Sequence, residues 1–225
     1  SWKSYDLFTK FVGGKERKPH KDVVLLLIDE NSMRFGEQLG LGRWPWKRLI
    51  YPEIINFINI ISPPKAVMFD ILFSESDPQI GNDDLFAKSV INSGNIYHNI
   101  LITQNAENKR GTSLPPDIKK NFTINVENAK QIAFDFNVGN EITVPLPCLR
   151  SAVTCSIKNL FAEIVDKTNK KDFMTLQNAS PSALGLSVAS FSADDDGIYR
   201  RGRLLFKYKN SFLPSLTLSA LLAYT

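Results

Sequence analysis

The stretch Val-Val-Leu-Leu-Leu-Ile-Asp, residues 23–29, decides the fold that the sequence predicts. Six apolar residues in succession, closed by a carboxylate, are typical of a central parallel strand that is covered on both faces. In open α/β sheets, ligands bind outside the carboxyl ends of the strands. We therefore expect binding chemistry first at Asp29 and in the loop that follows it.

The next segments predict two more strands, each preceded by a helix. The first helix has Pro52 in its first turn, where proline is tolerated, and residues 66–73 then predict a second buried strand. Residues 83–92 predict a short helix capped by Asn82, and residues 96–103 a third strand. The apolar positions that predict the first helix are Ile50, Ile54, Phe57, Ile58 and Ile61.

This β-α-β-α-β order in the first half favours an α/β fold, with a mostly parallel central sheet and flanking helices. In the second half, residues 184–191 and 203–208 are strand candidates on either side of an acidic turn, Asp194-Asp195-Asp196-Gly197. They predict an antiparallel hairpin. Residues 145–153 and 214–224 are predicted helices.

Composition is typical of a globular chain. It has 225 residues, 43% hydrophobic content and a formal net charge of +4, from 27 basic and 23 acidic side chains. This charge is too small to indicate a nucleic-acid partner, and no apolar run approaches the roughly 20 residues that cross a bilayer. We expect a soluble single domain, residues 1–225, with an entry helix at 1–13, an α/β core at 23–103, a variable excursion at 104–183, and a hairpin with an exit helix at 184–225.

Carboxylates gather just past the ends of the first two predicted strands. Clustered oxygen ligands of this kind suit Mg²⁺ or Ca²⁺. The alternative is structural: Asp29 and Asp70 cap loops or pair with Arg43 or Arg48. The carboxylates are Asp29, Glu30, Asp70, Asp77, Asp83 and Asp84.

Other motifs are incomplete. An EF-hand with Gly197 at its sixth position would place Arg203 where a bidentate glutamate is required, so a turn with Gly197 at positive φ is favoured instead. The dinucleotide and P-loop fingerprints and zinc-ligand spacing are missing from the sequence. Trp44 and Trp46, on either side of Pro45, predict either a rigid hydrophobic plug or a platform on which a ligand stacks.

Taken together, these residues resemble the extracytoplasmic sensory domain named for cyclases and histidine kinases (CHASE), in its second class. The resemblance covers most of the chain, departs from the pattern at residues 155–183, and is most specific where Trp-Pro-Trp-x-Arg precedes Phe-Asp-Ile-Leu-Phe. It rests on Tyr5-Asp6-Leu7, residues 24–29 with Ser32, Trp44-Pro45-Trp46 with Arg48, residues 66–70 with Phe73, Asp77, Asp83, residues 194–197 with Arg200, and Leu213-Pro214-Ser215-Leu216.

The resemblance implies a ligand-sensing module outside the cytoplasmic membrane, between flanking transmembrane helices, that regulates an intracellular cyclase or kinase. It implies a homodimer and a small-molecule or ion ligand, and no catalytic residue, metal or cofactor in this domain. The alternatives from other classes are a metal-dependent hydrolase that uses the acidic rim, and a structural dimerisation module. The residues expected to bind the ligand or brace its site are Asp29, Ser32, Trp44, Trp46, Arg48, Asp70, Asp77, Asp83, Asp196 and Arg200.

Overall fold

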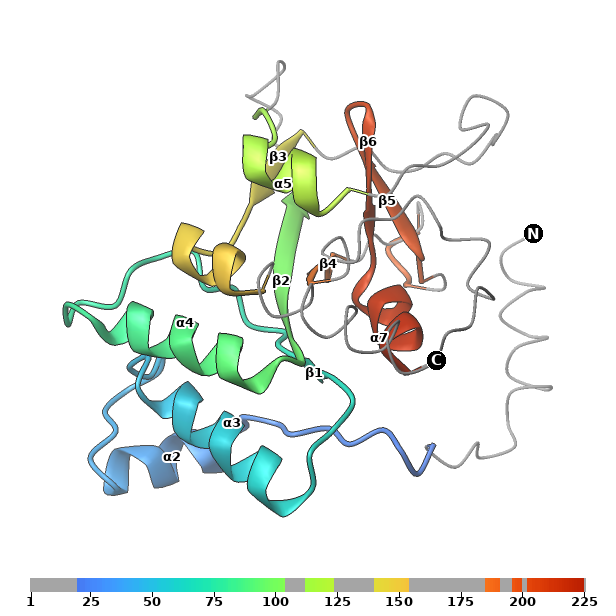
Figure 1. Ribbon diagram of the computed structural model, residues 1–225. Coiled ribbons are helices and arrows are strands. Elements are labelled where there is room, and N and C mark those ends of the chain that lie inside the picture. Colours follow the sequence, from blue (N-terminus) through green and yellow to red (C-terminus); the bar gives the residue numbers. More distant parts are fainter. Residues whose placement is uncertain are drawn as a thin grey trace, which may run out of the picture. The chain divides into compact units, whose positions relative to one another are not determined.

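The computed structural model of the chain is a mixed α/β protein (Figure 1). The structure describes residues 20–103, 112–123, 140–153, 185–190, 196–199 and 202–224. The chain divides into two compact units, Ser1–Trp46 and Lys47–Thr225, which we describe separately. The predicted entry helix at residues 1–13 lies outside the described residues.

The first unit contains helix α2 (Glu30–Gln38). The prediction of a central strand at residues 23–29 is wrong, because these residues form no ladder with any strand that the structure describes. The side chains from Val23 to Leu27 are 63–85% exposed. An apolar run shows that side chains favour burial, but a strand also needs a neighbouring backbone to accept its hydrogen bonds.

The sheet of the second unit is built around β2 (Ile96–Thr103), so the predicted third strand is the central one. It pairs in parallel with β1 (Val67–Met68) and β4 (Leu186–Val188), and antiparallel with β3 (Glu141–Thr143). The mostly parallel sheet is thereby confirmed. Residues Ile96 to Ile100 of β2 are all buried, which explains why this strand has no polar face turned to solvent.

Two helices precede β2 and pack against each other: α3 (Ile50–Ile61) and α4 (Asn82–Ser93). The predicted α3 is confirmed, and Gly94 ends α4 at φ 79°, as a glycine C-cap does. The cap predicted for α4 is wrong, because Gly81 precedes the helix and Asn82 is its first residue. The Asn82 amide is instead held by Asp77, 3.0 Å away.

The second predicted strand, at residues 66–73, is much shorter than its apolar pattern suggested. Only β1 (Val67–Met68) forms a ladder, although Phe69 N still donates to Tyr97 O at 2.9 Å. Beyond this point the chain turns away from the sheet, and Phe73 O accepts from Leu146 N at 2.9 Å. The aromatic residues that made this segment look like a strand are nevertheless buried in the core.

The antiparallel hairpin exists, but with different strands from those predicted. It joins β5 (Leu205–Tyr208) to β6 (Ser211–Pro214), and the turn between them contains Lys209 at φ 53°. A positive φ is what short hairpin turns require. Within the strand candidate at residues 184–191, the structure has the shorter strand β4, which pairs in parallel with β2 instead of forming the hairpin.

The remaining elements are helices. They are α5 (Pro116–Asn121), a helical segment at residues 147–153, and α7 (Leu216–Tyr224). The last two agree with the predicted helices, although Pro214 belongs to β6 and not to α7. The suggested strands at residues 124–126 and 133–138, and the insertion from 154 to 183, lie outside the described residues.

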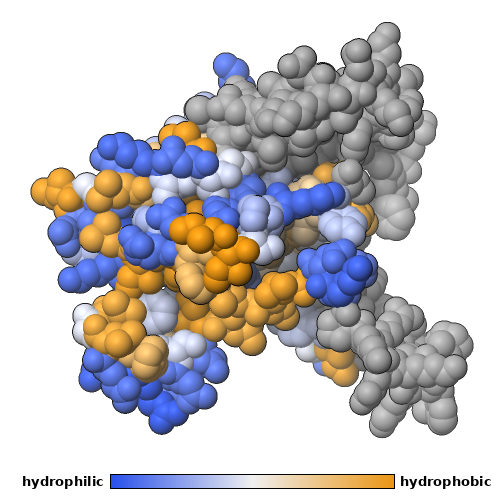
Figure 2. Space-filling view, turned by 60° about the horizontal axis from the view of Figure 1, so that its bottom comes forward, coloured by the Kyte–Doolittle hydropathy of each residue, from blue (hydrophilic) through white to orange (hydrophobic). Residues whose placement is uncertain are grey.

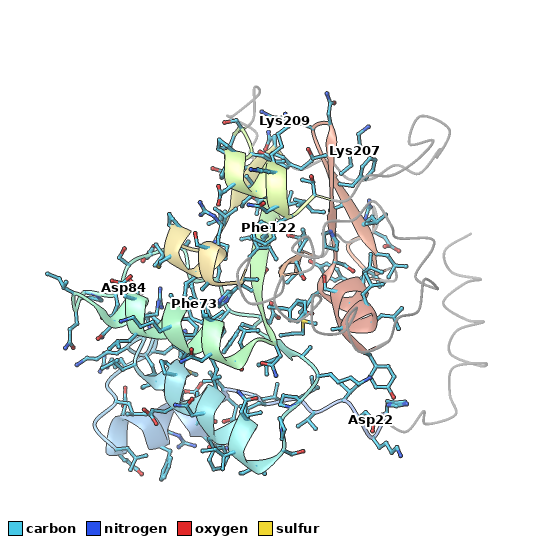
Figure 3. The ribbon with its side chains drawn as sticks, viewed as in Figure 1. Asp22, Phe73, Asp84, Phe122, Lys207 and Lys209 are labelled. Carbon is cyan, nitrogen blue, oxygen red and sulfur yellow. The ribbon has the colours of Figure 1, made fainter. Side chains whose placement is uncertain are left out.

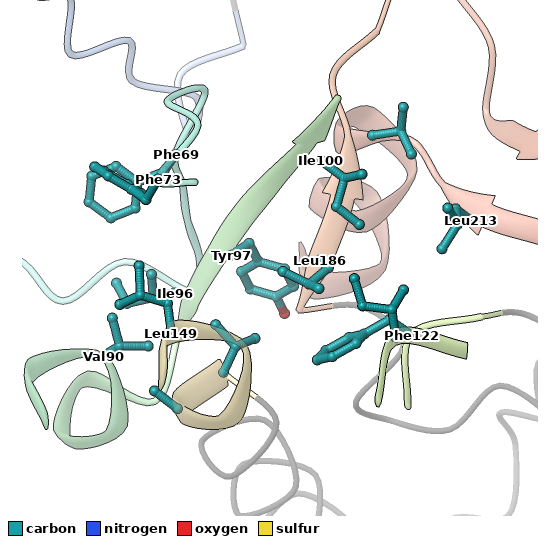
Figure 4. Packing of buried hydrophobic residues seen from close by; sticks show 14 of the residues in the cluster. Phe69, Phe73, Val90, Ile96, Tyr97, Ile100, Phe122, Leu149, Leu186 and Leu213 are labelled. Carbon is teal, nitrogen blue, oxygen red and sulfur yellow. The ribbon is translucent and has the colours of Figure 1, made fainter. Parts of the chain in front are cut away.

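One apolar core fills the second unit (Figure 4). Val90, Ile96 and Leu149 gather on one side of β2. Burial raises the pKa of the Tyr97 hydroxyl to about 12. Figure 2 shows apolar side chains on one face of the molecule as well, and those exposed on α3 are Phe57, Ile60 and Ile61. No helix among the described residues is both long enough and apolar enough to span a bilayer.

Candidate functional site

The candidate site is centred on Arg48, just before α3. Its side chain is only 11% exposed and bonds to Asp83 on α4, with 3.0 Å between Nε and Oδ1. A second guanidinium nitrogen, Nη2, donates to the backbone oxygen of Glu75. The guanidinium carbon also lies 4.7 Å from the centre of the Phe73 ring, a cation–π contact. Arg48 therefore joins α4 to the loop that follows β1.

Asp77 completes this cluster from the loop. Its Oδ2 accepts from Arg48 N at 2.7 Å, and its Oδ1 accepts from Gln79 N at 2.8 Å. Its own N–H donates to Asp83 Oδ2 at 2.9 Å. Burial acts to raise the pKa of Asp77, but the N–H donors of Arg48 and Gln79 outweigh it, so the pKa is lowered. Arg48, Asp77 and Asp83 thus form a network that ties a loop to two helices, whereas the sequence had offered Asp29 or Asp70 as partners of Arg48.

His98 is surrounded by three phenylalanine rings, which we call the phenylalanine box, and one of them, Phe73, also contacts Arg48. The His98 ring centre is 5.6–5.8 Å from the rings of Phe69, Phe73 and Phe86, and its side chain is fully buried. Neither ring nitrogen has a hydrogen-bond partner among the described residues. Burial, with a smaller effect from the Arg48 charge, lowers the pKa of His98 to about 3, so the imidazole is neutral.

Asp70 lies past the end of β1, as predicted, but away from the Arg48 network. It is exposed, and its Oδ1 accepts from Asn99 Nδ2 at 3.1 Å. The amide oxygen of Asn99 is buried and has no partner among the described residues. Reasoning from the sequence missed both His98 and Asn99, although two adjacent polar residues inside an apolar strand were a signal that could have identified them.

Asp29 and Ser32 belong to the first unit and form the cap of α2. Asp29 Oδ1 accepts from the Ser32 backbone N–H at 2.8 Å and from its hydroxyl at 2.7 Å. These two donors lower the pKa of Asp29. Asp29 thus lies at the start of a helix instead of the end of a strand, which is the structural alternative that the sequence left open.

Trp44 and Trp46 also belong to the first unit. Their rings meet edge to face with centres 5.6 Å apart. Trp46 is 8% exposed and Trp44 39% exposed. A Cβ atom added at Gly36 would lie 2.7 Å from Trp46 Cζ2, so α2 packs directly on this indole. This packing favours the hydrophobic plug over a stacking platform for Trp46.

The described part of the acidic turn, residues 196–199, has the predicted turn geometry. Asp196 Oδ1 accepts from Ile198 N at 3.3 Å, and Gly197 has φ 80°, as the turn interpretation requires. Both residues are exposed. Arg200 lies outside the described residues.

The acidic rim does not assemble as one site in the part of the chain that the structure describes. Among those residues, no group of three or more His, Cys, Asp or Glu side chains is placed to hold a metal ion. Asp77 and Asp83 instead bond to the backbone and side chain of Arg48. Cys148 is a free, partly buried thiol whose pKa is raised by burial, and Cys155 lies outside the described residues.

The chain was compared with models of protein families. The model of the CHASE2 domain matches residues 1–225, which is the whole chain. Comparisons with curated proteins and with solved structures gave no match.

The Arg48 network predicts that two neighbouring carboxylates of α4 differ in their effect on stability. Asp83 is 18% exposed and serves two donors, whereas its neighbour Asp84 is exposed at the start of the same helix (Figure 3). We expect Asp83→Ala to lower the free energy of unfolding by about 2–3 kcal/mol, because Arg48 loses its partner. Asp84→Ala should change it by less than about 0.5 kcal/mol. Urea denaturation followed by circular dichroism measures both, and equal losses would contradict the bracing role.

His98 predicts a loss of stability in acid. Its folded-state pKa of about 3 is below the ordinary value of 6.5, so the unfolded chain binds a proton first as the pH falls. The contribution of His98 is complete above pH 6.5 and decreases from there down to about pH 3, by roughly 1 kcal/mol per pH unit. Urea denaturation at successive pH values should show a smaller slope for His98→Phe than for wild type. The exposed His20, replaced by glutamine, is the control and should leave the slope unchanged.

The contact between α2 and Trp46 predicts a reversal of sign in a double-mutant cycle. Gly36→Ala should lower the free energy of unfolding by about 1 kcal/mol, because the added methyl overlaps the indole by more than helix propensity can offset. In a Trp46→Phe background, where Cζ2 is missing, the same substitution should raise it by about 1 kcal/mol. Thermal unfolding of the four proteins measures the cycle. Equal effects in both backgrounds would show that the indole does not limit this position.

Proposed function

Because the chain belongs to the CHASE2 domain family, we propose that it is the ligand-sensing input domain of a transmembrane signalling receptor. CHASE2 domains are extracytoplasmic sensory domains of membrane proteins. The observation that carries the proposal is the family match over residues 1–225, with no part of the chain left over. In this proposal, the chain recognises a small molecule or ion outside the cytoplasm and regulates a cyclase or kinase inside.

The geometry around Arg48 supports a role in recognition. Its guanidinium is committed to Asp83 and Glu75, and Asp77 is committed to backbone N–H groups. Side chains that bond to several neighbours hold a loop in one conformation, which is what a binding surface needs. Arg48, Asp77 and Asp83 thus act as bracing residues in the proposal, and the ligand contacts groups whose bonds are incomplete.

Helix α7 (Leu216–Tyr224) supplies a route by which binding is communicated. It packs on β4, and Lys65 Nζ donates to Tyr224 O at 2.5 Å. Lys65 Nζ also lies 4.9 Å from the centre of the Tyr224 ring. The end of α7 is therefore tied to the segment just before β1, so in this proposal a shift of the sheet also displaces the end of α7. We propose that the receptor works as a homodimer, in which two such helices move together.

The proposed location outside the cytoplasm is tested by chemical labelling. In the membrane protein that carries this chain, with Cys148→Ser and Cys155→Ser, Lys88→Cys places one thiol on the exposed face of α4. We expect a membrane-impermeant maleimide to label this thiol in intact cells, because the domain faces the exterior. Mass spectrometry or gel shift of the purified protein measures the modification.

A neighbouring position provides the matched control. Ala87→Cys puts the thiol at a residue that is only 7% exposed, so labelling should require denaturation. If the thiol of Lys88→Cys reacts only after the cells are lysed, the domain faces the cytoplasm and the proposed function is wrong.

A further inference from the structure

Four polar side chains, Asp70, Asn99, Ser187 and Ser219, form a row on one face of the central sheet, which we call the polar row. Tyr97 O accepts from Phe69 N while His98 N donates to Gly185 O, so β1 and β4 lie on opposite edges of β2. Asp70 therefore approaches Asn99 from one edge, at 3.1 Å.

The other half of the polar row lies beyond the opposite edge of β2. Asn99 is the direct partner of Ser187 in the parallel register, so their side chains share a face. Ser187 Oγ then donates to Ser219 Oγ of α7, at 2.7 Å. The polar row thus consists of two hydrogen-bonded pairs, Asp70–Asn99 and Ser187–Ser219, which the register of β2 and β4 places next to each other on one face.

Burial changes along this row in one direction. Asp70 is exposed, Asn99 is 7% exposed, and Ser187 and Ser219 are fully buried. The amide oxygen of Asn99 has no hydrogen-bond partner among the described residues, although the nitrogen of the same amide is bonded to Asp70. A buried amide oxygen without a partner is unfavourable, so a donor that reaches it from the Asp70 side gains a hydrogen bond that the unliganded chain does not make.

The groups of the polar row define the chemistry of a complementary ligand. Asp70 supplies one negative charge, and only its Oδ1 takes part in the bond to Asn99. The Asn99 oxygen is a second acceptor beside it. Two acceptors and one negative charge are matched by a small cation with several N–H donors, because charge-assisted hydrogen bonds are the strongest ones available here. A cation without N–H groups satisfies the charge but leaves the Asn99 oxygen unpaired.

We propose that the polar row is the ligand site of this sensory domain and that it takes a small molecule with a primary ammonium group. The ammonium bonds to the Asp70 carboxylate and to Asn99 Oδ1. This inference rests on the proposed function for its biological meaning, but the binding itself is a property of the chain alone. The hydroxyl pair of Ser187 and Ser219 then passes the change at Asn99 to α7.

Binding is tested on the 225-residue chain with two probe cations. Ethanolamine carries three N–H donors, and tetramethylammonium carries the same charge with none. Isothermal titration should show ethanolamine binding to wild type, with tetramethylammonium at least about tenfold weaker. Asp70→Asn should weaken ethanolamine by about tenfold or more, because it removes the charge and keeps the shape.

Asp84→Asn is the matched control, since Asp84 is an exposed carboxylate outside the polar row. It should leave ethanolamine affinity unchanged, and circular dichroism should show all variants folded, since Asp70 is itself exposed. The site assignment is overturned if ethanolamine shows no binding at concentrations up to about 10 mM. A Kd above that concentration corresponds to a binding free energy weaker than about 3 kcal/mol. Equal binding of the two cations, or unchanged binding by Asp70→Asn, overturns it as well.

The link to α7 has a separate readout. Amide hydrogen exchange of residues 216–224 should slow when ethanolamine binds to wild type. The Ser219→Ala variant should also bind ethanolamine, but its exchange in α7 should be the same with and without ethanolamine. Binding to wild type without any change in α7 overturns the link. Both measurements are made on the chain in solution, so they are independent of the labelling result that decides the proposed function.

Discussion

The pairing of β2 with three other strands is the constraint on which the second unit depends. Its backbone groups alternate between two edges, and strands from distant parts of the chain occupy both. Because residues Ile96 to Ile100 are all buried, each face of β2 must be covered by other elements. α4 and residues 147–153 supply apolar side chains to one face, and α7 packs on β4 beside it. Short strands such as β1 suffice because β2 orders them.

This constraint explains why two adjacent residues of β2 have different roles. His98 and Asn99 point to opposite faces, as neighbours in a strand do. His98 enters the phenylalanine box, where an uncharged imidazole packs like another aromatic ring. Asn99 enters a polar environment with a carboxylate on one side and a serine on the other. The His98 face thus packs the imidazole among aromatic rings, while the Asn99 face carries the unpaired amide oxygen beside an exposed carboxylate on which our ligand proposal is built.

The predicted site residues of the second unit have two different roles, bracing in the Arg48 network and ligand binding in the proposed polar row. Arg48, Asp77 and Asp83 bond to one another, to the backbone and to the Asn82 amide, so they hold the loop after β1 and the start of α4 together. Asp70 lies outside that network and keeps an exposed carboxylate. Asp29 and Trp46 serve the first unit, at the cap of α2 and in its packing.

The sequence by itself determined the helices α3 and α4, the strand β2 and the parallel sheet, because these depend on local spacing of apolar residues and on glycine stops. It also indicated the family, and it named Arg48, Asp77 and Asp83 as candidate residues without predicting that they bond to one another. Only the tertiary structure decided that residues 23–29 stay outside the described sheet, that β4 pairs in parallel, and that Asn99 lies between Asp70 and Ser187. Those outcomes depend on which backbone edges form hydrogen bonds with each other, and the local spacing of apolar residues does not specify which strands become neighbours.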